Sequence, residues 1–318
     1  MGGTEIICLG ISALDILVRG IGDFRLDGQT VFSRDIELIP GGDALNEAVT
    51  LSRLGHKVRL LTLTGADFQR DVILKYCSEN GLAADGIQCG SFPTSTSIAM
   101  ITENGERTII GQENGSAREF SASDIDMSVF QPGVKAVSIG SLFCSERLDD
   151  KGLTAILEKA HNCGAVTVAD FVMDLKEWSL DSIAGALKYL DYAIPSYEEA
   201  VYYTKMQEPS RISAVFKSYG VKNVIIKMGA DGIYADIEGR ELQLPSLAKK
   251  VIDTTGAGDS FTAGFISGLV QNLNAKEGLI FASAAAAITV QKVGASGAVN
   301  SREQIRQYME EEVWDETI

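Results

Sequence analysis

The sequence predicts one α/β domain in which helices cover both faces of a parallel sheet and a small β lid lies over one edge. From about residue 134 onward, short apolar strands alternate with helices, which is typical of a parallel sheet. Two stretches near 12–40 and 92–115 instead alternate polar and apolar residues between glycines, as antiparallel strands with one solvated face do. Because no repeat or low-complexity linker interrupts the 318 residues, we expect a single domain over 1–318, with the two stretches inserted as the lid.

The composition is that of a globular protein and excludes several classes of function. Hydrophobic residues make up 45% and charged residues 22%, which is enough for a full core. The 28 basic and 43 acidic residues give a net charge of −15, which argues against a nucleic-acid partner but not against a small anionic substrate in a local pocket. The five cysteines form no CxxC pair and there are only two histidines, so neither a structural zinc site nor a His-rich metal site is expected.

The start of the chain and its hydropathy predict a cytoplasmic protein without a membrane partner. The N-terminal run MGGTEIICLGI has neither the basic region nor the cleavage site of a signal peptide. The longest run of small apolar residues, 284–290, is far shorter than the roughly 18 residues that span a bilayer.

The first 115 residues are expected to hold the first strands and helices of the main domain together with both lid stretches. One apolar stripe follows Pro40 and ends at Gly55, which predicts a helix and its stop. A turn at Glu103-Asn104-Gly105 between two alternating runs predicts a hairpin. In chain order we expect strands at 6–11, 16–18 and 30–39, the helix after Pro40, a strand at 58–63 and a helix at 68–79.

The remainder of the chain is expected to build most of the parallel sheet. The strands predicted there are 136–139, 165–169, 192–194 and 224–227, followed by a hairpin over 232–244. The helices predicted there are 153–160, 183–187, 212–219, 258–272, 275–290 and 301–311.

The segment 251–261 predicts an anion-binding turn at the start of a helix. The backbone amides of Gly256, Ala257 and Gly258 are expected to be free there, and their small side chains let a phosphate approach. Asp259, in the first helical turn, is placed to take a proton from a hydroxyl while the amides hold the phosphoryl group under attack. The alternative is an Asp that merely complements the helix dipole. Neither GxxxxGK[ST] nor GxGxxG occurs at this turn.

A second candidate site opens the first long helix. Gly41 and Gly42 let the backbone reach a ligand, and Asn46 offers both a donor and an acceptor, which suits a polyol. The alternative is a tight turn capped by Asp43. Asp15 follows the first strand, where open α/β sheets collect ligands, and its carboxylate has room for two sugar hydroxyls, although a strand-end Asp is more often a turn residue.

Taken together, these segments resemble the ribokinase-like (phosphofructokinase-B type) family of carbohydrate kinases along essentially the whole chain. The run DTTGAGDSF, residues 253–261, matches the family's C-terminal signature residue for residue, and residues 41–55 match its N-terminal signature. The resemblance implies a three-layer α/β/α fold with a mostly parallel sheet and a small antiparallel β lid. It also implies an ATP-dependent transfer of the γ-phosphoryl group to a hydroxyl of a small sugar.

The resemblance gives each candidate residue a role. It makes Asp259 the general base and places the anion hole at Gly256, Ala257 and Gly258. The residues it implies for the substrate hydroxyls are Asp15, Gly41, Gly42 and Asn46. The residues it implies on the nucleotide side are Lys227, Gly229, Gly232, Ser196 and Thr255, although the loop 227–232 taken alone also fits a plain turn.

The implied cofactors are ATP and Mg²⁺, with K⁺ as a further candidate. Glu199 would organise Mg²⁺ through bound water. Asp253 and Thr255, with carbonyls near 294–296 and Ser301, would hold the monovalent cation. The lid forms the dimer interface in many relatives, so the resemblance also implies a homodimer through it.

Two positions depart from the family pattern. Ser196 stands where the family commonly has Asn, which puts direct phosphate contact by this residue in doubt. Arg70 stands where the family often has Gly, and it either lies near the substrate or is a solvated helix residue.

Two other functions stay open. A nucleoside kinase of the same family would need a base-binding surface, which Phe24, Phe32 and Phe92 of the lid region offer. A sugar- or nucleotide-binding sensor without catalysis is the alternative from another class, and the intact Asp259 and its glycine turn argue against it.

The implied mechanism places the substrate under the lid with its hydroxyl against Asp259 while Mg²⁺ bridges the ATP phosphates. Because the hydroxyl loses its proton only as the new bond forms, even an Asp with an ordinary pKa can serve as the base. Closure of the lid would exclude water and limit ATP hydrolysis.

Overall fold

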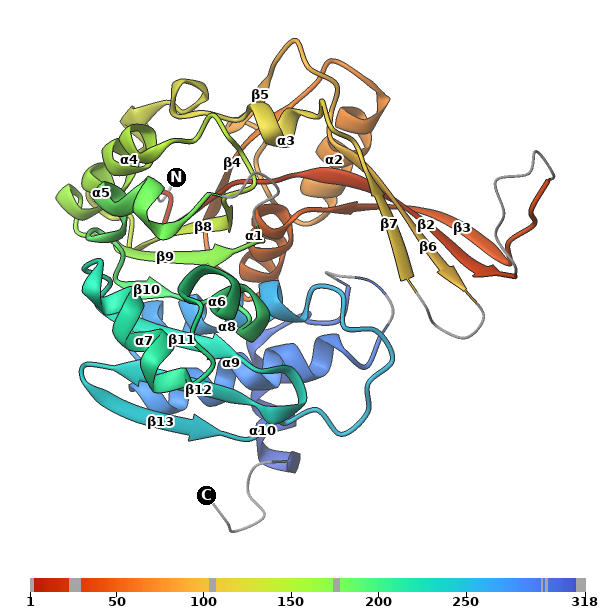
Figure 1. Cartoon of the computed structure of the whole chain (residues 1–318). Helices are drawn as coiled ribbons and strands as arrows, with labels where there is room; N and C mark the ends of the chain where they lie inside the picture. The colour runs from red at the N-terminus through yellow and green to blue at the C-terminus, as the bar shows by residue number, and fades with distance from the viewer. Residues whose placement is uncertain are drawn as a thin grey trace.

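The computed structural model describes residues 3–22, 30–102, 107–173, 178–292, 294 and 297–312, and within them two sheets form (Figure 1). The main sheet has nine strands in the order β13-β12-β11-β10-β9-β8-β1-β4-β5. Its strands are β1 (Ile6–Leu9), β4 (Val58–Thr64), β5 (Ile87–Cys89), β8 (Ala136–Leu142), β9 (Val166–Phe171), β10 (Tyr192–Ala193), β11 (Asn223–Lys227), β12 (Ile233–Ile237) and β13 (Arg240–Leu244). From β5 to β11 the pairing is parallel, and the hairpin of β12 and β13 adds two antiparallel strands at one edge.

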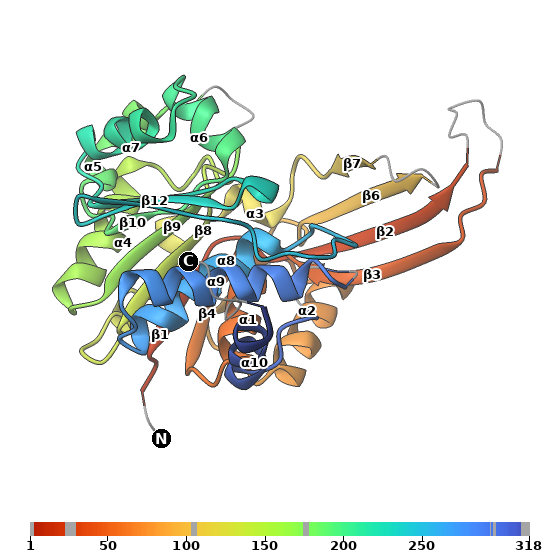
Figure 2. The same cartoon turned by 90° about the horizontal axis from the view of Figure 1, so that it is seen from below.

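Helices cover both faces of this sheet, as the alternation of strands and helices predicts (Figure 2). One face is covered by α4 (Asp150–Asn162), α5 (Ala184–Leu187), α6 (Tyr197–Thr204) and α7 (Pro209–Ser218). The other is covered by α1 (Asp43–Arg53), α2 (Phe68–Glu79), α8 (Ala257–Val270) and α9 (Ala275–Thr289), with α10 (Arg302–Glu312) packed outside α9. A short helix, α3 (Ser116–Glu119), precedes β8.

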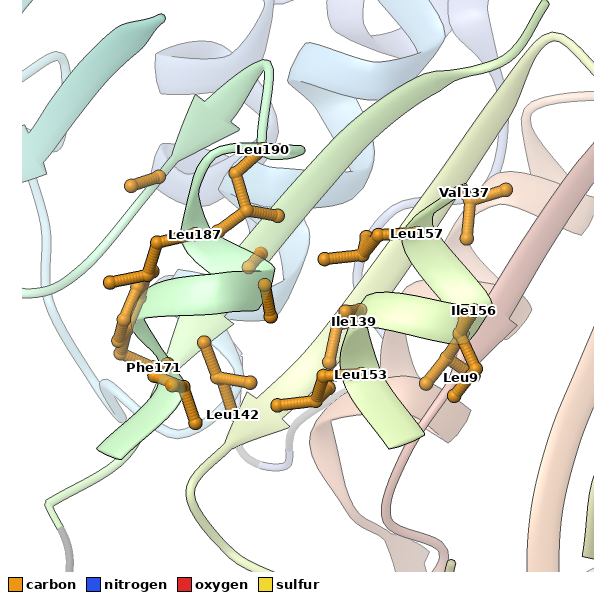
Figure 3. Packing of buried hydrophobic residues seen from close by; sticks show 14 of the residues in the cluster. Leu9, Val137, Ile139, Leu142, Leu153, Ile156, Leu157, Phe171, Leu187 and Leu190 are labelled. Carbon is orange, nitrogen blue, oxygen red and sulfur yellow. The ribbon is translucent and has the colours of Figure 1, made fainter. Parts of the chain in front are cut away.

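The alternation of side chains along the central strands creates the two halves of the core. In β1, Ile7 and Leu9 belong to the core cluster on the α4 side, whereas Ile6 and Cys8 belong to the cluster on the α1 side. Figure 3 shows the first of these clusters, where leucines and isoleucines of α4 and α5 pack onto β8 and β9. Burial on both faces explains why β1 is a continuous apolar run in the sequence.

The second sheet is the lid, and it projects from the main domain (Figures 1 and 2). Its order is β3-β2-β6-β7, with β2 (Ala13–Ile21) and β3 (Asp35–Gly41) from the first insertion and β6 (Thr96–Thr102) and β7 (Arg107–Gly111) from the second. The outer pairs β2–β3 and β6–β7 are antiparallel, and the central pair β2–β6 is parallel. The expected turn at Glu103-Asn104-Gly105 lies outside the described residues.

Most expected elements are confirmed with shifts of a few residues, but the sequence prediction lacks the helices α3 and α6 and the strand β5. The structure contains α6 (Tyr197–Thr204), where we predicted no element. Ser196 and Glu199 form a capping box that starts it, since each side chain binds the other's backbone amide. The S-x-x-E spacing was a usable signal, but the helix has only 8 residues and a weak apolar stripe.

The strand order changes direction between β1 and β8, which places a crevice at the carboxyl ends of these two strands. The chain proceeds from β1 outward to β4 and β5, and later from β8 outward to β11. The N-terminus of α1 enters this crevice, and a Cβ on Gly140 would lie 2.7 Å from the amide nitrogen of Ala44. Only a glycine therefore permits the close approach that brings α1 to the switch point.

Candidate active site

The N-terminus of α8 forms the turn that the sequence predicts as an anion site. Gly256 is the N-cap with φ of 74°, a left-handed conformation that favours glycine, and no side chain caps the helix. Ala257 departs from the prediction, because its amide donates to the Thr254 carbonyl at 3.2 Å and is not free. Among the described residues no hydrogen bond leaves the amides of Gly256 and Gly258, so these two stay available to an anion.

Asp259 is buried in the first turn of α8 and accepts a hydrogen bond of 2.7 Å from Asn46 Nδ2. Burial raises the pKa of Asp259 well above its usual range, and the carboxylates of Asp43 and Asp170 raise it further. The Asn46 hydrogen bond and the nearby Lys227 oppose this rise. The sequence did not indicate how deeply this carboxylate is buried, and so gave no sign of the raised pKa.

Of the four residues expected to bind substrate hydroxyls, one contacts Asp259 and two lie against each other at the base of the lid. Asn46 reaches Asp259 from α1, and Gly41 at the end of β3 lies against the Asp15 carboxylate. Asp15 lies inside β2 rather than directly after β1, so it belongs to the base of the lid, where Ser97 Oγ donates to Asp15 Oδ1 at 2.6 Å. The fourth residue, Gly42, is the N-cap of α1.

Asp43 is not the cap that the alternative interpretation proposed. It is the first residue of α1, no side chain caps this helix, and its carboxylate accepts a hydrogen bond from Ser141 Oγ at the end of β8. Burial raises the pKa of Asp43 to about 6, against the lowering effect of the Ser141 hydrogen bond. The charges of Asp170 and Asp15 add to the rise, so Asp43 lies between the acceptor side and the nucleotide side of the site.

A cleft of about 940 Å³ extends from Asp43 and Asp259 across the carboxyl edge of the sheet. Its volume suits a ligand of nucleotide size. Four of the five residues expected on the nucleotide side line it, namely Lys227, Gly229, Gly232 and Ser196. Thr254 lines it in place of the expected Thr255. The sequence offered no adenine-binding residues, and the cleft supplies an apolar wall from Leu247, Val251, Ala286, Ala287 and Val290.

Glu199, the expected magnesium-organising residue, lines the same cleft. One of its carboxylate oxygens accepts from the Ser196 amide at 2.7 Å, which fixes the side chain in the first turn of α6. Burial raises the pKa of Glu199, and Asp170 raises it further. Among the described residues no group of three or more His, Cys, Asp or Glu could by itself hold a metal ion. A single carboxylate fits a Mg²⁺ that is held mainly by phosphates and water.

The expected cation residues Asp253 and Thr255 are tied into a local turn. Asp253 Oδ1 accepts from the Thr255 amide at 2.9 Å and from its hydroxyl at 2.6 Å, and Asp253 Oδ2 accepts from the Gly294 amide at 3.0 Å. The bond from Gly294 brings the expected segments 253–255 and 294 together beside the start of α8. Ser301 instead accepts from the Gln304 amide at the start of α10, and residues 295 and 296 lie outside the described residues.

Arg70, Phe32 and Phe92 do not line this cleft. The Arg70 guanidinium binds Thr64 Oγ1 and the carbonyl of Gln88 at 3.2 Å, so it joins the ends of β4 and β5. The Arg147 guanidinium lies 5.8 Å from the ring centre of Phe92. Phe32 is 84% exposed, and Phe24 lies outside the described residues.

Sequence reasoning missed Asp170, which the structure places at the centre of the site. It lies near the end of β9, is 4% exposed, and accepts a hydrogen bond of 2.5 Å from Lys227 Nζ. A carboxylate near the end of the buried run VTVADF was the available signal, because a buried acid requires a partner.

A doubly wound sheet whose switch point holds a buried carboxylate, available helix amides and a nucleotide-sized cleft has the parts that phosphoryl transfer requires. The chain belongs to the pfkB family of carbohydrate kinases, whose family model matches residues 4–302. It is thus a kinase that transfers a phosphoryl group to a sugar hydroxyl.

Relatives agree over nearly the full length. The ribokinase of Lactococcus lactis is 25% identical, over 97% of this chain and 98% of its own, and the pseudouridine kinase of Escherichia coli is 25% identical, over 86% of each. The ribokinase structure from Thermotoga maritima has a TM-score of 0.80 at 25% identity, over 96% of this chain and 99% of that one. Arabidopsis thaliana ribokinase complexed with ribose and ATP has a TM-score of 0.84 at 24% identity, over 97% and 99%.

The structural model contains no helix long and apolar enough to cross a membrane, as far as its described residues extend.

Proposed function

We propose that the protein is an ATP-dependent kinase of a small free sugar, with Asp259 as the general base. The observation that carries the proposal is the contact between Asn46 and Asp259 at the start of α8. This contact supports the assignment, because it joins a residue expected on the acceptor side to the carboxylate that follows the free amides of Gly256 and Gly258. A base and an anion site at one helix terminus are what phosphoryl transfer to a hydroxyl needs.

In the proposed step, the sugar hydroxyl oxygen attacks the γ-phosphorus of ATP and forms the new O–P bond. The bond between the γ-phosphorus and the bridging oxygen breaks, and its electron pair stays on the β-phosphate of the departing ADP. The hydroxyl proton passes to Asp259, whose raised pKa favours accepting it. The amides of Gly256 and Gly258 stabilise the charge on the transferred group.

ATP and Mg²⁺ fit the residues of the cleft. A putative ribokinase II of Escherichia coli, 21% identical, has a structure in complex with ATP and Mg²⁺. In this chain Glu199 would hold Mg²⁺ through water, and Mg²⁺ would neutralise phosphate charge during the transfer. The turn of Asp253 and Thr255 beside Gly294 supports a K⁺ site next to the anion hole.

The charges near the base favour a neutral sugar over a phosphorylated one. Asp15 lies close enough to Asp43 to raise its pKa, and Asp43 in turn raises the pKa of Asp259, so carboxylates line the acceptor side. Lys227, the cation that reaches this cluster within the described part of the chain, lies in the wall of the nucleotide cleft and not beside Asp15. A phosphate on the acceptor would therefore meet like charge without a counterion.

We further propose that two copies of the chain pair through the lid. The register aligns Leu38, Ile16, Ile98 and Ile110 across all four lid strands on one face. Of these, Leu38 is 52% and Ile110 is 51% exposed, whereas Asp15 projects from the opposite face. An exposed apolar face that crosses four strands is typical of an association surface. A second copy of the chain would cover this face and leave the opposite face, with Asp15, to the substrate.

Release of ADP from Mg-ATP, measured with and without K⁺, tests the function. The acceptors to compare are ribose, deoxyribose, fructose, fructose 1-phosphate, 2-keto-3-deoxygluconate and several nucleosides. Strong turnover with one free sugar supports the proposal and names the substrate. Turnover only with nucleosides would make the protein a nucleoside kinase, and nucleotide binding without turnover across the panel would favour a sensor.

A further inference from the structure

Lys227 is a largely buried cation that has no part in the proton transfer to Asp259. It is the last residue of β11, and its ammonium donates to Asp170 Oδ2 at 2.5 Å. The side chains are 15% and 6% exposed, so the pair lies in the wall of the cleft and not on the protein surface.

The ammonium lies beside the N-terminus of α8. A Cβ built on Gly258 would be 3.1 Å from Lys227 Nζ and 3.9 Å from Asp170 Oδ2. The amide of Gly258 and the Lys227 ammonium therefore border the same small volume. A tetrahedral phosphoryl group bound at the amide brings one of its oxygens next to Nζ.

Asp170 is held firmly enough to position the ammonium. Its Oδ1 accepts from the amide of Phe171 at 2.8 Å, and its Oδ2 also accepts from Thr262 Oγ1 on α8 at 3.1 Å. Asp170 thus connects β9, α8 and β11 at one point. An ammonium carries three N–H donors and Asp170 takes one of them, so donors remain for a phosphoryl oxygen.

The environment keeps this ammonium charged. Burial alone would lower the pKa of Lys227, but the carboxylates of Asp170, Glu199 and Asp259 raise it above its ordinary value. A fixed positive charge in a partly dehydrated wall stabilises charge developing on a transferring group more strongly than an exposed lysine does.

We propose that Lys227 is a catalytic residue that, together with the α8 amides, stabilises the phosphoryl group while it moves from ATP to the sugar, and that Asp170 is the positioning residue that aims it. The proposal rests on the kinase function above. Lys227 forms and breaks no covalent bond. It donates hydrogen bonds to the oxygens of the group in transfer, and the proton from the sugar still goes to Asp259.

The first experiment measures steady-state kinetics with Mg-ATP and the best acceptor of the panel. Lys227→Met should lower kcat by at least ~10²-fold with less than about 3-fold change in either KM, because the contact is made in the transition state. Lys227→Arg should restore part of kcat. Asp170→Asn should also lower kcat. Its kcat should depend more strongly on ionic strength than that of the wild type, since the ammonium is no longer held. A raised KM for ATP with unchanged kcat in Lys227→Met would make Lys227 only a ground-state nucleotide ligand and overturn the proposal.

Lys217→Met is the matched control. Lys217 Nζ lies 2.5 Å from Asp236 Oδ1, and Asp236 also accepts from a hydroxyl, that of Ser213, at 2.8 Å. This pair has the same composition as the Lys227 site but does not line the cleft. We expect its kcat to stay near that of the wild type.

A second experiment needs no acceptor. Calorimetry compares the binding of MgADP with and without aluminium fluoride, which mimics the phosphoryl group in transfer. The wild type and Lys217→Met should bind MgADP at least ~10-fold more tightly with aluminium fluoride, whereas Lys227→Met should lose this gain and keep its affinity for MgADP alone. Equal tightening in Lys227→Met, or none in the wild type, would contradict the proposal. If no sugar of the panel supports ADP release but aluminium fluoride still tightens MgADP binding through Lys227, the result would contradict the sugar kinase and not the role of Lys227.

Discussion

The proton affinity of Asp259, the proposed base, depends on its burial and on residues from three other elements, α1, β9 and β11. Its carboxylate meets Asn46 of α1, and the charges of Asp43 and Asp170 raise its pKa. A carboxyl group in this environment accepts a proton more readily than an exposed one, which suits the removal of a proton from a hydroxyl of high pKa.

We expect Asp259→Asn to lower kcat by at least ~10²-fold, because the amide cannot accept the hydroxyl proton. The dissociation constant of MgADP should change little, since the amides and the cleft remain. ADP release and calorimetry measure the two quantities. Turnover at the wild-type rate would show that Asp259 is not the base.

The raised pKa of Asp259 has a consequence for the pH profile. The base works only when deprotonated, so activity should fall as the pH drops through this raised pKa, earlier than for an ordinary carboxylate. Asp43→Asn removes one of the charges that raise the pKa, and the acidic limb of kcat/KM should therefore move to lower pH.

Asp85→Asn is the control for this shift, because Asp85 pairs with Arg59 and is half exposed. Its profile should match that of the wild type. An acidic limb that moves to higher pH in Asp43→Asn, or does not move, would contradict the assigned coupling between Asp43 and Asp259.

Asp15 should act mainly on sugar binding. Its carboxylate is oriented by Ser97 and lies against Gly41, away from the nucleotide cleft. Asp15→Ala loses hydrogen bonds to a charged group worth roughly 1.5–3 kcal/mol each, so the KM for the sugar should rise by about 10-fold or more with little change in the KM for ATP. Initial-rate measurements over both substrates test this, and an unchanged KM for the sugar would remove Asp15 from the site.

At the scale of elements, His56 joins three parts of the α1 side of the molecule. It follows α1 and is buried, with Nδ1 3.0 Å from Glu5 Oε2 before β1 and Nε2 2.8 Å from Ser267 Oγ in α8. Arg302 of α10 lies 3.1 Å from Nε2. Burial lowers the pKa of His56 below its ordinary value near 6.5, with the Arg302 charge acting in the same direction.

This lowered pKa predicts a loss of stability in mild acid. The folded state favours the neutral ring, so the contribution of His56 is present above its ordinary pKa and is lost as the pH falls through the lowered one. Urea unfolding at pH 7.5 and pH 5.5 should show a lower midpoint in acid for the wild type and a smaller difference for His56→Gln. His161→Gln, at the other histidine of the chain, is the control. An equal acid loss in His56→Gln would contradict this.

At the scale of the whole molecule, our proposals give the lid a separate role on each of its two faces. Asp15 on one face would bind the sugar, and the aligned apolar residues on the other face would contact a second copy of the chain. Dimerisation would then support the strand that holds a substrate residue.

We expect a dimer at micromolar concentration by sedimentation equilibrium and a monomer for Leu38→Asp, because the new charge would be buried in the apolar interface. Met206→Asp changes a residue that is 37% exposed and lies outside the lid, and it should stay dimeric. A wild-type monomer, or a Leu38→Asp dimer, would contradict pairing through the lid.

Much of the fold was predictable because it depends on short-range patterns. The helix Phe68–Glu79 was predicted to the residue, and the strands around Val58 and Val224 to within a residue or two. The missing helix α6 shows the limit of periodicity, since a short helix with a good cap carries little apolar pattern.

The candidate site also has a part that could be predicted from the sequence and a part that could not. Asp259, Asn46 and the glycine turn stand in local runs that the sequence displays, and their family signatures identify them. Asp170 and Lys227 are 57 positions apart, and nothing local indicates that they meet. The contact between Ser141 and Asp43, which are 98 positions apart, could not be predicted from the sequence either.

By itself, the sequence determined the strand and helix order, the two lid insertions and the turn that begins α8, because each depends on residues a few positions apart. Only the tertiary structure decided which charges share the site, that Ala257 does not offer a free amide, and that burial raises the pKa of Asp259. The physical reason is that burial and electrostatic coupling depend on distances in space between elements brought together by packing, and chain spacing does not specify those distances.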